Sequence, residues 1–123
     1  MKSELYKKIK EIDITKLDDQ DKQELLRIFM VTQNPSIRDH IAFIFSDLHY
    51  DKAIPFIIQK INDKGIINNN GALIFALNDM NVKDYGISFK RIICEHGYEA
   101  RLMAYGIVEK YAASISSEIT NLA

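Results

Sequence analysis

The side chains that could carry out catalysis or bind a metal are few in this sequence and stand far apart. The three histidines are His40, His49 and His96, and Cys94 is the single cysteine. A zinc site uses ligand pairs at short spacings, such as two histidines one helical turn apart, and no such pair occurs here. Cys94 and His96 stand two positions apart, so on a predicted helix their side chains point to different sides and do not form a nucleophile pair. We therefore expect no metal, and we expect Cys94 to be a small, semi-buried apolar residue.

Carboxylates are frequent, but their spacing selects no pair for general acid–base catalysis. Helix surfaces ordinarily carry solvated acids, and this is the simpler interpretation of Asp39, Asp47, Asp79, Asp84, Glu95, Glu99 and Glu109. Gly71 and Gly86 belong to no phosphate-binding loop and are expected in helix packing or at a helix start. The sequence thus predicts a protein that is not an enzyme and takes no cofactor.

The composition is that of one globular domain over residues 1–123. Apolar residues make up 47% and charged residues 27%, a normal balance for a folded domain. The net charge is −1 and no third of the chain is strongly basic, so we do not expect nucleic-acid binding, although a basic face could still be assembled in three dimensions. No apolar run approaches the ~20 residues of a membrane span, and the start of the chain has no signal-peptide core. We expect a cytoplasmic protein without an internal disulfide that does not bind a membrane.

Apolar residues recur at helical spacing, which predicts an all-α fold of about eight helices with short connections. The clearest stripe comprises Ile37, Ile41, Ile44, Phe45 and Leu48. Similar stripes follow within residues 54–61, 73–80, 89–93 and 102–107. Several stretches rich in Ile and Phe locally favour strands, but helical spacing over long spans outweighs that preference.

Polar residues and glycines mark the expected helix ends. Asn34-Pro35 reads as a helix stop followed by a start, with proline in the first turn. Thr15 with Asp18 resembles a loose capping box. Gly65 and Gly97 fall just past apolar stripes, where a left-handed residue closes a helix.

A weak internal repeat of about 30 residues relates the predicted helices. A shift of 31 residues matches residues 54–61 with residues 85–92, and it places Ile61 on Ile92. A shift of 30 places Phe45 on Phe75, and a second shift of 30 places Phe75 on Tyr105. One helix pair cannot bury its apolar stripe alone, so we expect successive pairs to stack and share a core.

Residues 34–63 carry several features of a HEAT repeat. They are the polar-proline turn, the Ile37-Arg38 pair, Ala42, the Asp47-Leu48 helix end, Ala53-Ile54-Pro55 at the next helix start, and Asp63. Residues 68–80 resemble the second helix of the following repeat, although an Asn stands where the family usually has Arg. The chain resembles the HEAT-repeat family over roughly two thirds of its length, with a period shorter than the ~40–47 residues usual there. The resemblance implies a short right-handed α-solenoid of three to four HEAT-like helix pairs.

Proteins of this family mostly bind other proteins along the face formed by their second helices, and small bacterial members resemble immunity proteins that neutralise a toxin. The resemblance therefore implies a non-catalytic protein-binding module, most specifically an immunity protein with a toxin as its partner. A scaffold or adaptor that recognises a peptide stays open as an alternative. A nucleic-acid-acting HEAT-like enzyme is the third alternative, but it would need a strongly basic groove. Self-association is left open.

The residues expected to contact a partner lie on the predicted second helices. His40, Phe43 and Asp47 share one face at spacings of three and four residues, and Arg101, Tyr105 and Glu109 are again four apart. Aromatic, arginine and acidic side chains in an exposed strip are typical of protein-binding hot spots. The full set of expected partner-binding residues is His40, Phe43, Asp47, Asn70, Asn78, Arg101, Tyr105 and Glu109. Two simpler interpretations remain open: the aromatic residues pack between helix pairs, and the run of Asn68, Asn69 and Asn70 only caps a helix.

Overall fold

The computed structural model describes residues 8–63, 70–97 and 99–110, and within these ranges the chain is helical with connecting turns and contains no strand. The predicted all-α class is confirmed. Gly65, Asn68 and Asn69 lie outside the described residues. Within the described part of the chain, no helix has the length and apolar character needed to cross a membrane.

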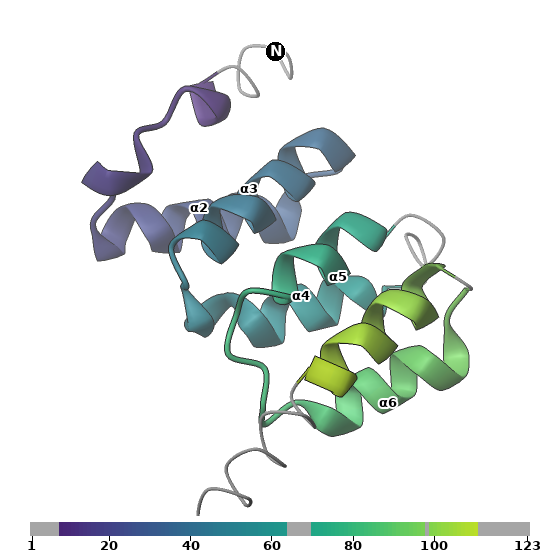
Figure 1. The fold of residues 1–123 in the computed structure, drawn as a ribbon. Helices are drawn as coiled ribbons and strands as arrows, with labels where there is room; N and C mark the ends of the chain where they lie inside the picture. Colours follow the sequence, from purple (N-terminus) through teal and green to yellow (C-terminus); the bar gives the residue numbers. More distant parts are fainter. Residues whose placement is uncertain (1–7, 64–69, 98, 111–123) are drawn as a thin grey trace, which may run out of the picture.

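Figure 1 shows the helices in chain order. After a helical turn at residues 8–10 come η1 (Ile14–Lys16), α2 (Asp19–Val31), α3 (Pro35–Asp47), η2 (Asp51–Ala53), α4 (Ile54–Ile61), α5 (Gly71–Leu77) and α6 (Gly86–Glu95). Residues 99–110 form a further helix, drawn in yellow-green beside α6. Helix α2 packs against α3, α4 against α5, and α3 against α5.

The helix starts follow from polar side chains that accept hydrogen bonds from the first free backbone N–H groups. Asn34 Oδ1 accepts hydrogen bonds from Ser36 N at 2.9 Å and from Ile37 N at 3.3 Å, with Pro35 in the first turn of α3. The predicted Asn34-Pro35 start is confirmed. Each of these bonds satisfies a backbone donor that would otherwise be left without a partner in the helix.

The capping box of α2 lies three residues after the predicted one. Asp18 Oδ1 accepts a hydrogen bond from Asp21 N at 2.8 Å, and Asp21 Oδ2 accepts one from Asp18 N at 3.2 Å. Thr15 lies in η1 instead, where its hydroxyl donates to Asp13 Oδ1 at 2.6 Å. The prediction of Thr15 as the cap was wrong because an Asp can take both positions of a capping box.

Helix α3 ends in a left-handed residue that is not a glycine. His49 has φ 51°, and among the described residues no glycine has a positive φ, so the left-handed conformation predicted for Gly97 was wrong. Tyr50 N donates to Phe45 O at 2.9 Å and His49 N donates to Ser46 O at 3.1 Å. These two bonds are the pattern of a Schellman motif, and the Phe45 and Tyr50 rings, 5.3 Å apart, supply its apolar contact.

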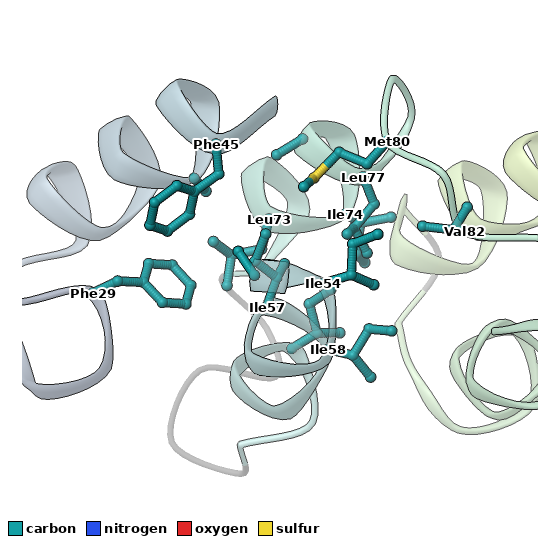
Figure 2. Packing of buried hydrophobic residues seen from close by; sticks show 14 of the residues in the cluster. Phe29, Phe45, Ile54, Ile57, Ile58, Leu73, Ile74, Leu77, Met80 and Val82 are labelled. Atoms are coloured by element: carbon teal, nitrogen blue, oxygen red, sulfur yellow. The ribbon is translucent and has the colours of Figure 1, made fainter. Parts of the chain in front are cut away.

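The core lies between the helices and consists mainly of isoleucine, leucine and phenylalanine. Figure 2 shows Phe29 of α2 facing Phe45 of α3, with ring centroids 6.2 Å apart in an edge-on arrangement. Ile54 and Ile57 of α4 point toward Leu73 and the neighbouring apolar residues of α5 (Figure 2). These side chains are buried because the 3.6-residue helical period gathers them on one side of each helix.

The burial of matched residues distinguishes the 31-residue shift from the 30-residue shift, both of which were predicted from the sequence. The 31-residue shift matches positions of equal burial, since Ile61 and Ile92 are both buried. The 30-residue shift from Phe45 to Phe75 was wrong, because Phe45 is buried and Phe75 is exposed. Phe43 is the exposed counterpart of Phe75, so α3 and α5 correspond with an offset of 32 residues.

Candidate functional site

A row of exposed apolar side chains crosses α3, α5 and the helix of residues 99–110. It consists of Phe43, Phe75, Leu102 and Tyr105, with 36%, 58%, 54% and 59% of their surfaces exposed. We call these four residues the exposed row. The Phe43 and Phe75 rings lie edge to face with centroids 6.3 Å apart. Phe43 and Phe75 stand 32 positions apart in the chain, so only the folding of the chain brings them into contact.

Two shallow hollows connect the rest of the row. Phe75 and Leu102 line a hollow of about 270 Å³ between α5 and the helix of residues 99–110. Leu102 and Tyr105 line a second hollow of about 220 Å³, together with Ile93 and Arg101. The four members therefore form one continuous apolar surface over three neighbouring helices.

The helical period explains why these apolar residues point outward. In α3 the buried stripe includes Ile41, Ile44 and Phe45, which leaves Phe43 on another side of the helix. In α5 the residues on both sides of Phe75 in the sequence are buried, namely Leu73, Ile74, Ala76 and Leu77. In the last described helix Ala100, Ala104 and Ile107 are buried. Exposed aromatic residues of this kind do not contribute to the core, so a function outside the core is the simplest reason for them.

An acidic hollow lies beside the C-terminal ends of α3 and α5 and beside Lys110 of the last described helix. It has a volume of about 610 Å³, and its charged lining consists of Asp47, Asp51, Asp79 and Lys110. We call it the acidic hollow. Three carboxylates stand there against one ammonium group. Asn78 lines both this hollow and the apolar hollow beside Phe75, so the two surfaces are continuous.

Hydrogen bonds to backbone atoms fix the walls of the acidic hollow. His49 Nδ1 lies 3.0 Å from Asp79 O, and Asp51 Oδ1 accepts a hydrogen bond from Asn81 N at 3.3 Å. Lys110 Nζ donates to Asn78 O at 2.9 Å. The first two bonds join residues 30 positions apart, and the third joins residues 32 positions apart. The acidic hollow is therefore formed by contacts between segments about 30 residues apart in the chain.

Most residues expected to contact a partner lie on this side of the molecule. Phe43 and Tyr105 belong to the exposed row, and Arg101 lines the hollow beside Tyr105. Asp47 and Asn78 line the acidic hollow. Glu109 is exposed on the last described helix, and His40 of α3 is partly buried. Asn70 differs from the others, because it is buried.

Asn70 belongs to a buried polar network at the ends of α4, α5 and α6. Its amide Nδ2 donates to Ile61 O at 3.0 Å and lies 3.1 Å from His96 Nδ1. His96 Nε2 lies 2.9 Å from Asn62 Oδ1. Because Asn70 Nδ2 is a donor, His96 Nδ1 must accept, and Nε2–H donates to Asn62. The amide of Asn70 is thus used inside the fold, where it is the residue before α5 but makes no side-chain capping bond.

The network requires a neutral His96. Burial lowers the pKa of His96; the negative charge of Glu95 opposes this and the positive charge of Arg91 adds to it. A proton on Nδ1 would also turn that atom into a second donor facing the Asn70 amide. His96 therefore has a structural role, as a member of the buried hydrogen-bond network. Cys94, by contrast, is exposed on α6. The expectation of a semi-buried Cys94 was wrong, because the buried positions of α6 are Phe89 and Ile92.

Several members of this surface are absent from the set of partner-binding residues expected from the sequence. Phe75 and Leu102 are missing from it because their neighbours in the chain are equally apolar, and spacing alone does not say which residue of an apolar run faces outward. Asp79 was expected only as a solvated surface acid and Asp51 was not expected at a partner surface, because the two come together only through the packing of α3 against α5. The signal that could have found Phe75 is the 32-residue correspondence with Phe43.

Within residues 8–63, 70–97 and 99–110, no three His, Cys, Asp or Glu side chains come together in a way that could hold a metal ion. Comparison of the chain with protein-family models, with curated proteins and with solved structures found no match. The candidate site therefore rests on the geometry of the exposed row and of the acidic hollow.

Proposed function

We propose that this protein is a non-catalytic protein-binding module, and that it binds another protein through the exposed row and its borders. The observation that carries the proposal is the continuous apolar surface of Phe43, Phe75, Leu102 and Tyr105 across three helices, in which the first two rings are in contact and the others line shared hollows. Large aromatic side chains held on rigid helices supply contact area at a low entropic cost, and they are enriched among binding hot spots.

The proposal also covers how the helices are paired. We propose that α2 with α3, α4 with α5, and α6 with residues 99–110 are three HEAT-like helix pairs of a short right-handed α-solenoid. Residues 34–63 then comprise the second helix of the first pair and the first helix of the second pair. The packing of α3 against α5 and the equal burial of Ile61 and Ile92 support this arrangement. In such a solenoid each pair contacts only its neighbours, and the second helices form one extended surface.

The narrower form of the proposal is an immunity protein that neutralises a toxin, and it rests on the HEAT-like residues of the sequence. A neutralising partner must be held tightly, which takes an interface of at least ~1,000 Å² in total. A surface that spans three helices offers an area of that order. Co-expression with a candidate toxin tests this form: growth rescue supports it, and continued killing in the presence of folded protein contradicts it.

The test of the broader proposal is retention of a partner from lysate of the source cells by immobilised protein. The double variant Phe75→Ser/Tyr105→Ser removes two of the three aromatic side chains of the exposed row. Phe56→Ser/Ile87→Ser is the matched control, because Phe56 and Ile87 are also exposed but lie on α4 and α6. We expect one protein to be retained by the wild type and the control and lost by the row variant. Equal retention by all three proteins, or no retention by any, would overturn the proposal.

A further inference from the structure

We propose that the partner contributes a single amphipathic helix with one apolar stripe and with lysine or arginine along one flank of that stripe. The inference rests on the proposed function and adds the chemistry of the partner. The apolar stripe lies on the exposed row, and the basic flank faces the C-terminal ends of α3 and α5 and the last described turn of the helix of residues 99–110.

The apolar part follows from the shape of the exposed row. The row is one or two side chains wide on each helix, which matches the narrow stripe of one amphipathic helix. Helix axes in contact lie about 8–10 Å apart, so three helices span roughly 16–20 Å. A helix rises 1.5 Å per residue, so about 11–13 residues cover that span. A continuous segment of ordinary helix length is therefore sufficient.

The charged part follows from an acid that stands four residues after each aromatic member of the row. Asp47 follows Phe43, Asp79 follows Phe75 and Glu109 follows Tyr105. All three acids are exposed. Phe43 with Asp47 in α3, and Tyr105 with Glu109 in the last described helix, share one face, because residues four apart lie about one helical turn of 5.4 Å apart along the axis. Asp79 lies two residues beyond the end of α5 and lines the acidic hollow. A line of acids thus runs beside the row on its C-terminal side.

The acidic hollow strengthens this negative border. Asp51 joins Asp47 and Asp79 there, and the single ammonium group in its lining, from Lys110, donates to Asn78 O. The C-terminal end of α3 adds the negative end of a helix dipole. Since the hollow is open to solvent and lies beside the row, a basic side chain on a docked helix can reach it while the apolar stripe stays on the row.

The N-terminal side of the row carries no net negative charge. The basic flank of the partner helix must therefore lie on the C-terminal side. Four residues before the aromatic members stand Asp39, Gly71 and Arg101. Arg38 lies 2.8 Å from Asp39 and offsets its charge, and Arg101 would repel a basic side chain. The matching helix therefore carries its Lys or Arg residues on one flank only.

The test is selection from a displayed library of helix-forming peptides of about 16 residues, slightly longer than the span of the row, randomised at the stripe and on both flanks, against the wild-type protein. We expect enrichment of peptides with an apolar stripe and with Lys or Arg on one flank. Their affinity is then measured by fluorescence anisotropy at low salt. Asp47→Lys/Asp79→Lys should weaken binding roughly five- to tenfold, since exposed charge pairs contribute modestly. Glu11→Lys/Asp84→Lys, which makes the same change in net charge at exposed sites elsewhere, should leave the affinity unchanged.

The outcomes separate this inference from the proposed function. Peptides that bind through Phe75 and Tyr105 but carry no basic flank, or that ignore Asp47→Lys/Asp79→Lys, would overturn the inference and leave the proposed function standing. If no peptide depends on the exposed row, the helical partner is overturned, and retention from lysate still decides the proposed function. Self-association that is lost in Phe75→Ser/Tyr105→Ser, measured by sedimentation, would also overturn the inference, because a second copy would then occupy the surface.

Discussion

His96 Nδ1 lies 3.1 Å from the Asn70 amide nitrogen, across 26 positions of the chain. The contact is buried and connects the residue after α6 with the residue before α5. Because the amide nitrogen can only donate, the histidine ring must be neutral and must accept at Nδ1. A long-range hydrogen bond of this kind makes the stability of the fold depend on the protonation of one side chain.

The free energy of unfolding should fall as the pH drops below the ordinary histidine pKa of about 6.5. Burial lowers the pKa of His96 in the folded protein, so in this window the unfolded chain binds a proton that the folded chain does not. Stability is then fully present above about pH 6.5 and is lost as the pH falls toward the folded-state pKa. Urea unfolding between about pH 7.5 and about pH 5.5 measures the effect. In His96→Gln, which cannot titrate, this part of the pH dependence should be absent; equal pH profiles for the two proteins would contradict the assignment.

Asn70→Ala should destabilise the fold by about 1–3 kcal/mol, because it leaves His96 Nδ1 and Ile61 O without the amide that bonds to both. Asn81→Ala is the control, since Asn81 is exposed and such a change typically costs within about 0.5 kcal/mol. Chemical denaturation measures both. A cost at position 70 no larger than at position 81 would show that the network contributes nothing.

Phe45→Ala should cost about 3–5 kcal/mol, because Phe45 is fully buried between Phe29 and Tyr50 and its removal leaves a cavity. Phe75→Ala should cost less than about 1 kcal/mol, because more than half of its surface is exposed. The two Phe→Ala variants thus compare the loss of stability at a core position with the loss at a position of the exposed row. Similar midpoints of unfolding for the two variants would contradict the burial assigned to them.

Asn34→Ala should lower the free energy of unfolding by about 1 kcal/mol, because two backbone N–H groups at the start of α3 lose their acceptor. Asn34→Asp keeps an acceptor oxygen at the same place and should retain most of the stability. Thermal unfolding followed by circular dichroism distinguishes the two variants. An alanine variant as stable as the aspartate variant would mean that Pro35 alone is enough to start this helix.

Local signals predicted the helical class and the start of α3. The stripe from Ile37 to Phe45 and the Asn34-Pro35 pair act within a few residues, so the sequence alone specifies them. The position of the α2 capping box was wrong by three residues because several polar residues near Asp18 could serve as the cap. His49 shows a further limit: its left-handed conformation comes from the hydrogen bonds that end α3, which a sequence pattern does not reveal without a glycine.

The candidate site was predictable in part. The helical period placed Phe43, Asp47, Tyr105 and Glu109 on faces outside the core. It did not predict the contact of Phe43 with Phe75, because that contact depends on the 32-residue offset between α3 and α5. It also misjudged Asn70, whose amide bonds to atoms 9 and 26 positions away. Relationships of this length follow from how helices pack, and they have no local signature in one sequence.

One pattern occurs on α3, at α5 and on the last described helix: an aromatic residue is followed four positions later by an acidic residue. Each of these segments thus adds one aromatic and one acidic side chain to a common surface. In the proposed solenoid, a gene duplication of about 30 residues would lengthen this surface by one unit, and a deletion would shorten it. The reach of the surface can therefore evolve by copy number, separately from the chemistry of each unit.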